Sequence, residues 1–168
     1  KNYLLFTYQN ATGQVDVRGI DLAMDYLLTD QITLSATYSN LNRNVFEKAP
    51  GATAANPLTA NAAKNRATAT FRWADEAKGT SFEFRSRYTD AFPVNSGVFN
   101  SYNVSTPIRY DAVPVNFFFD AGYSMKLPFA QNVRWALNAQ NILDNKVPSF
   151  VGVPDVGRFI TTRIQYTF

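Results

Sequence analysis

The chain has 168 residues, a net charge of +3, a mean hydropathy of -0.21 and neither cysteine nor histidine. The missing thiols and imidazoles exclude disulfides, Cys or Ser/His nucleophile pairs and metal sites built on these side chains. We therefore expect no metal, no cofactor and no enzyme activity. The basic residues are scattered along the chain, which disfavours nucleic-acid binding.

The remaining composition favours a membrane protein built from strands. Aromatic residues make up 15% of the chain, and charged residues only 17%, against roughly 25% in soluble domains. No run of about 18 apolar residues is present, so a membrane crossing would require a β-barrel. Nothing marks a second domain, and residues 1–168 are expected to form one barrel unit. The chain opens at Lys1 without Met or a signal peptide, from which we expect a processed chain or a fragment.

Alternating apolar and polar residues predict about eight antiparallel strands, each long enough to cross a bilayer when tilted. In chain order they cover residues 4–8, 20–28, 32–38, 67–73, 82–88, 115–127, 133–139 and 158–168. A soluble β-sandwich also shows such alternation, but its outer face usually carries many Lys and Glu. Here Arg outnumbers Lys by ten to six, and Glu appears only three times. The prediction is therefore an all-β, transmembrane antiparallel β-barrel.

Short and long connections alternate between these strands. Residues 29–31, 74–79 and 128–131 predict tight turns, whereas residues 41–64, 90–113 and 142–157 predict longer loops rich in Asn, Pro and Gly. This asymmetry is typical of outer-membrane barrels, which have short periplasmic turns and longer extracellular loops. The terminal strand would then run toward the periplasm.

Charged residues gather on the polar side of the predicted strands, where they would face the barrel lumen or a plug. They are Asp21, Asp25, Arg66, Arg72, Arg85, Arg87, Asp120, Arg134 and Arg163. The arginines could form a ladder that attracts anionic ligands, or hold a plug through charge-assisted hydrogen bonds, and we favour the second interpretation. Asp21 and Asp25 would lie about 13 Å apart along one strand, too far for a glycosidase pair. We expect them to pair with Arg on neighbouring strands.

The best candidates for ligand contact lie on the predicted loop 90–113. They are Phe92, Asn95, Phe99, Tyr102, Asn103 and Arg109. Their aromatic faces and polar groups would suit a sugar, a peptide or a siderophore. The alternative is that they only pack the loop against its neighbours.

Several short stretches resemble the C-terminal barrel region of TonB-dependent outer-membrane receptors, in particular the large Bacteroidetes-like type. They are VRGIDL at 17–22, ANAAK at 60–64, FPVNSGVF at 92–99, NILDN at 141–145 and FVGVPDVGR at 150–158. The NILDN stretch is similar to the turn that precedes the last hairpin loop of that family. The end of the chain, with Ile164, Tyr166 and Phe168, resembles the signal that the barrel assembly machinery recognises.

The resemblance implies the last third of a 22-stranded barrel in the outer membrane of a Gram-negative bacterium. Such a receptor takes up a solute that its extracellular loops capture. Its partners would be outer-membrane lipid, the barrel assembly machinery, candidate outer-membrane partner proteins, and a TonB-type energy transducer acting through a plug that this chain lacks. Two alternatives stay open: a small eight-stranded barrel filled with side chains, and a non-transporting barrel with a structural or partner-binding role. An outer-membrane enzyme is the weakest alternative because histidine is missing.

Overall fold

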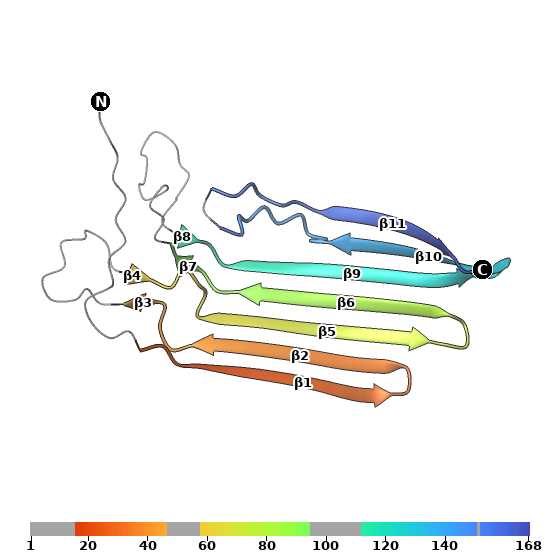
Figure 1. Cartoon of the computed structure of the whole chain (residues 1–168), viewed down its shortest axis with the longest axis horizontal. Coiled ribbons are helices and arrows are strands. Elements are labelled where there is room, and N and C mark those ends of the chain that lie inside the picture. The colour runs from red at the N-terminus through yellow and green to blue at the C-terminus, as the bar shows by residue number, and fades with distance from the viewer. Residues whose placement is uncertain (1–15, 47–57, 95–111, 151) are drawn as a thin grey trace, which may run out of the picture.

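The computed structural model describes residues 16–46, 58–94, 112–150 and 152–168. These residues form one antiparallel sheet in which each long strand pairs with the next long strand along the chain (Figure 1). The strands are β1 (Gly19–Thr29), β2 (Ile32–Leu41), β5 (Asn65–Asp75), β6 (Thr80–Thr89), β9 (Asn116–Leu127), β10 (Ala130–Gln140) and β11 (Phe159–Tyr166). No helix in the described ranges is long and apolar enough to cross a membrane.

The predicted all-β fold is confirmed, and seven of the predicted strands are found close to their expected positions. The strand predicted at residues 4–8 lies outside the described residues. Two of the predicted loops contain additional short strands: β3 (Val45–Phe46) pairs with β4 (Leu58–Thr59), and β7 (Phe92–Pro93) pairs with β8 (Ala112–Val113). Strands of two residues are too short to produce a periodic pattern, so the sequence predicted loops alone there.

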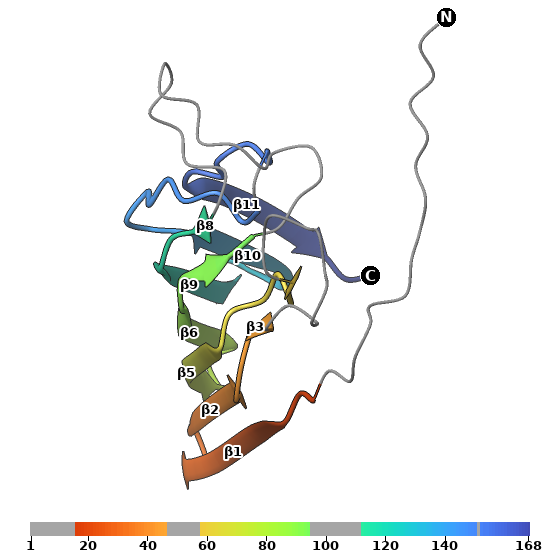
Figure 2. The same cartoon turned by 90° about the vertical axis from the view of Figure 1, so that its left-hand side faces the viewer.

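The sheet is a curved wall and is not closed into a barrel. Strands β1 and β11 form its two edges, and the view along the strands shows the wall bending between them (Figure 2). An up-and-down sheet of seven strands has edge strands that run in the same direction. Antiparallel closure would therefore require further strands between β1 and β11.

The register gives the sheet one polar and one apolar face. Residues directly opposite each other on paired strands point to the same face, and many apolar residues lie opposite apolar partners, as in the Leu34–Phe71 and Phe71–Phe84 pairs. The apolar face remains exposed, since Leu22 keeps 60% and Ile164 72% of its surface. Nothing in the described residues covers this face.

The buried core lies at the loop end of the sheet. Ala63, Phe92, Val94 and Val113 form one buried cluster, with Phe150 packed against it. These residues come from the connections that follow or precede the long strands and not from the strands themselves. The described core thus holds the loops together, while both faces of the sheet stay open.

Candidate functional site

The polar face of the sheet brings together all nine charged residues that the sequence assigned to a lumen. Register pairs such as Ser39–Arg66, Arg72–Glu83 and Arg85–Asp120 place them on this one face. The complete set is Asp21, Asp25, Arg66, Arg72, Arg85, Arg87, Asp120, Arg134 and Arg163. Their common face follows from the two-residue period of a strand, which survives each tight turn. That this face borders a lumen or a plug stays a prediction.

Glu83 joins two of these arginines. Arg72 donates to Glu83 Oε2 from Nη2 at 2.7 Å and from Nε at 3.2 Å, and Arg85 Nη2 donates to Glu83 Oε1 at 2.9 Å. The carboxylate lies directly opposite Arg72 on the neighbouring strand and two residues from Arg85 on its own strand. One negative charge therefore serves two guanidinium groups. Glu83 lies two residues before Arg85, so the two-residue period of a strand predicts it on the same polar side as these arginines.

Asp120 connects the wall to the loop that follows β10. Arg87 forms two hydrogen bonds with this carboxylate, from Nε at 2.9 Å and from Nη2 at 3.0 Å. The guanidinium also stacks over the ring of Phe118, 5.4 Å from its centroid. The backbone N–H of Asn141 donates to Asp120 Oδ1 at 2.9 Å. Paired guanidinium bonds of this kind are directional as well as strong, so Asp120 positions both partners.

The NILDN stretch forms a tight turn centred on the side chain of Asn141, which is only 5% exposed. Its Nδ2 donates to the carbonyls of Asn145 and Val156 at 2.9 and 3.1 Å, and its Oδ1 accepts the N–H of Asn145 at 3.0 Å. Asn141 has a φ of 51°, a left-handed conformation that Asn tolerates better than most residues. The motif thus closes the last loop by replacing missing backbone partners with one amide side chain.

Asp144 and Asn145 add two further ties to this turn. Asp144 Oδ1 accepts the N–H of Arg158 at 2.8 Å, and Asn145 Nδ2 donates to the carbonyl of Phe117 at 2.7 Å. A Cβ on Gly157 would come within 2.8 Å of Asp144 Oδ1, so a larger residue would push this carboxylate away from its position against the N–H of Arg158. The similarity of NILDN to a family turn thereby has a physical basis in this chain.

The expected pairing of Asp21 and Asp25 with arginines is not found among the described residues. Their neighbours on β2 are Ser39 and Ser35, and Asp25 accepts a hydrogen bond from Ser35 at 2.5 Å. The expectation was wrong for β2 because this strand presents only Ser and Thr to its polar side. The polar face is therefore acidic at β1 and mainly basic from β5 to β11.

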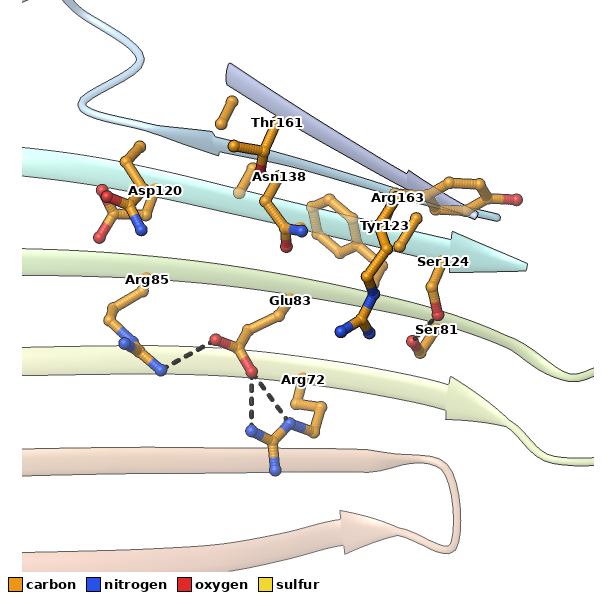
Figure 3. Close-up of a pocket in the computed structure, with 16 residues that line it drawn as sticks. Arg72, Ser81, Glu83, Arg85, Asp120, Tyr123, Ser124, Asn138, Thr161 and Arg163 are labelled. Atoms are coloured by element: carbon orange, nitrogen blue, oxygen red, sulfur yellow. Dashed lines mark hydrogen bonds and ion pairs between the residues drawn. The ribbon is translucent and has the colours of Figure 1, made fainter. Parts of the chain in front are cut away.

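A hollow of about 430 Å³ lies on the polar face over β5, β6, β9, β10 and β11. Three arginines and two carboxylates line it, with neutral polar and small residues between them (Figure 3). The charged residues are Arg72, Glu83, Arg85, Asp120 and Arg163. Figure 3 shows Arg163 extending from its strand toward Glu83, with Arg72 and Arg85 on the far side of that carboxylate.

Of the predicted loop contacts, only Phe92 lies in the described residues. It is 6% exposed and packs in the cluster with Val94 and Val113. This burial favours the alternative in which the residue packs the loop. Asn95, Phe99, Tyr102, Asn103 and Arg109 lie outside the described residues.

A polar network marks the apolar face at its loop end. Asn65 accepts hydrogen bonds from Tyr38 at 2.8 Å and Asn40 at 2.7 Å, and donates to Asp90 at 2.5 Å. Tyr88 also donates to Asp90. These donors hold the pKa of Asp90, just beyond the end of β6, below its ordinary value, with the hydroxyl of Tyr88 as the largest cause. Because Asn65 and Tyr88 donate to different oxygens of Asp90, the network stabilises the ionised carboxylate more than the protonated form.

The terminal residues share the apolar face. Ile164 lies opposite Trp135, and Tyr166 opposite Val133. The rings of Tyr166 and Phe168 are 5.8 Å apart, and both side chains are exposed. The predicted assembly signal is therefore accessible, while its recognition stays a prediction.

Comparison with solved structures agrees with this architecture. The chain superposes on the siderophore receptor PiuA from Acinetobacter baumannii with a TM-score of 0.65 and 18% sequence identity, over 90% of this chain. The chain has the fold of a segment of a β-barrel wall. It spans 22% of that receptor's length. No protein-family model and no curated protein sequence matches the chain.

Proposed function

We propose that this chain is part of the wall of a bacterial outer-membrane receptor that imports a solute by TonB-coupled transport. The observation that carries the proposal is the exposed apolar face, which runs across all seven strands opposite a charged face. Soluble monomers rarely expose contiguous apolar patches larger than a few hundred Å². Alternating strands with an apolar outer band and a polar interior are the pattern of membrane barrels.

The ends of the strands support a position across the bilayer. Six of the seven long strands have 10 to 12 residues, close to the roughly 9–11 that a tilted membrane strand needs. Tyr38 and Tyr88 lie at the loop end of the apolar face, and Trp73 and Trp135 lie nearer the turn end. Aromatic residues at two levels match the two interfacial girdles of such barrels. The tight turns would then face the periplasm and the long connections the outside.

The transport role is supported by the likeness to a siderophore receptor together with the charged face of the wall. In this proposal the polar face borders the lumen, a plug supplied by chain beyond the described residues fills it, and an energy transducer acts on that plug. The loops would capture the solute, and a ferric siderophore is the first class to test because the structural neighbour is named for one. A Bacteroidetes-like receptor with about 22 strands is the specific form that we propose.

The barrel and its location are tested by fractionation and gel mobility. The full protein should appear in the outer-membrane fraction and migrate differently before and after heating, because closed barrels resist detergent unfolding. Deleting Phe168 should lower the amount inserted, while Thr167→Ser, a conservative change in the neighbouring residue, should not. A soluble protein without a heat-modifiable band would overturn the proposal.

Transport is tested separately by uptake of radiolabelled iron as a ferric siderophore. Uptake should require the protein and stop when the energy transducer is deleted, while binding at the cell surface persists. Correct insertion without any energy-dependent uptake of a bound solute would favour the alternative of a scaffolding barrel.

A further inference from the structure

The hollow on the polar face has a floor of small residues. Ser81, Ser124 and Ala136 lie side by side in one row across β6, β9 and β10, and Gly122 lies next to this row. A Cβ on Gly122 would come within 2.9 Å of Asn138 Oδ1. A larger residue here would require the Asn138 amide to shift, so glycine leaves this part of the floor open, and longer side chains surround it.

The charges around the hollow do not balance. Three arginines and two carboxylates line it, which leaves a formal excess of one positive charge. Asp120 is already paired with Arg87, outside the lining, by two hydrogen bonds of 2.9 and 3.0 Å. Glu83 alone then faces Arg72, Arg85 and Arg163, and it is bonded only to the first two. One further anion beside Arg163 would balance the charges that line the hollow.

Hydrogen-bond donors without a protein partner lie at the same place. In the described part of the chain, the side chains of Arg163, Asn138 and Thr161 form no hydrogen bond or ion pair with one another or with other residues. They belong to neighbouring strands, since Asn138 lies directly opposite Thr161 and Arg163 is two residues further along β11. Figure 3 shows Asn138 and Arg163 on the same side of the sheet as Glu83. A guanidinium, an amide and a hydroxyl thus share one open space.

We propose that this hollow binds a carboxylate group. The guanidinium of Arg163 would donate two parallel hydrogen bonds to its oxygens, a geometry that guanidinium and carboxylate groups share, and Asn138 and Thr161 would donate to the remaining lone pairs. The volume of about 430 Å³ lies in the range of small-molecule sites. The carboxylate belongs either to a dissolved solute or to a polypeptide segment seated on the polar face. This inference rests on the proposed function only in placing this face along a lumen.

Titration calorimetry of the full protein in detergent at low ionic strength tests the site with two probes, citrate and a short blocked peptide containing aspartate. Arg163→Met should weaken binding about tenfold, as expected for a charge-assisted contact. Glu83→Gln should tighten binding several-fold, because it removes the competing negative charge. A merely structural role for these residues would not produce changes of opposite sign.

Arg18→Met serves as the matched control, because Arg18 is exposed and its ion-pair partner is Asp16, away from the hollow. Its affinity for both probes should equal that of the wild type. Citrate binding that depends on Arg163 identifies a dissolved carboxylate, and binding of the peptide alone identifies a polypeptide carboxylate. If neither probe binds, or if both bind Arg163→Met as well as the wild type, the inference is wrong. A heat-modifiable band in the same preparation shows that the barrel is intact, so this failure is distinct from failure of the proposed function.

Discussion

Replacing Asn141 tests whether one side chain holds the last loop against the sheet. The substitution Asn141→Ala removes three hydrogen bonds, to the carbonyls of Asn145 and Val156 and from the N–H of Asn145. At about 1 kcal/mol each, they contribute about 3 kcal/mol. Alanine at a φ of 51° adds about 1 kcal/mol of backbone strain. The expected cost is about 4 kcal/mol, and Asn141→Gly should cost about 1 kcal/mol less because glycine adopts this conformation freely.

Hydrogen exchange is the appropriate assay because the cost should appear as local opening of the loop and not as unfolding of the whole sheet. The amide of Asn145, which donates to Asn141, should lose its protection in Asn141→Ala. Asn116→Ala is the matched control. Asn116 is the first residue of β9, at the loop end of the sheet, and its side chain forms no hydrogen bond with a described residue. Equal protection of the Asn145 amide in Asn141→Ala and in the wild type would refute the assigned role.

Three further predictions concern the two faces of the sheet. Ala69→Arg on the apolar face should lower the unfolding free energy by about 2–4 kcal/mol, and Thr68→Arg on the polar face by less than about 1 kcal/mol; urea unfolding from vesicles compares them, and equal costs would contradict the assignment of the faces. A double-mutant cycle of Arg87→Met and Asp120→Asn should give a coupling of about 1 kcal/mol, and zero coupling would exclude a stabilising pair. The folded-state pKa of Asp90 is depressed, so its stabilising contribution is complete above the ordinary value and is lost as the pH falls below it; Asp90→Asn should flatten the acid limb of an unfolding titration, and an unchanged limb would count against this contribution.

The strands and their two faces could be predicted from the sequence because a strand has a side-chain period of two. Phe71 and Trp73 alternate with Thr70 and Arg72, and the tight turns keep this alternation in phase between neighbours. A shift of one residue would move every apolar side chain to the polar face. The apolar pattern therefore determines the register wherever a turn is short, which explains why all the predicted charged residues share a face.

The partners of these charges could not be predicted with the same success. The sequence placed Asp25 among arginines, but the adjacent strand offers Ser35, and the pairing of Glu83 with two arginines depends on side-chain conformations as well as register. The hollow is lined by residues of five strands, and a long loop separates the last of them, β11, from its neighbour β10. Gly122 left no signal of its own, because a glycine in a strand also occurs at bulges and close approaches.

Asp120 shows how the wall and the loop form one mechanical unit. Its Oδ1 accepts hydrogen bonds from Arg87 Nη2 at 3.0 Å and from the N–H of Asn141 at 2.9 Å, so one carboxylate oxygen serves both the polar face and the turn that begins the last loop. Within the same turn, Asn145 Nδ2 donates a hydrogen bond to the carbonyl of Phe117 on β9. Both of these hydrogen bonds from the loop are accepted by residues of β9. The loop therefore cannot tilt away from the sheet without breaking them. A rigid strand thus positions a loop in the way that binding loops require, and the same strand contributes Gly122 to the floor of the hollow.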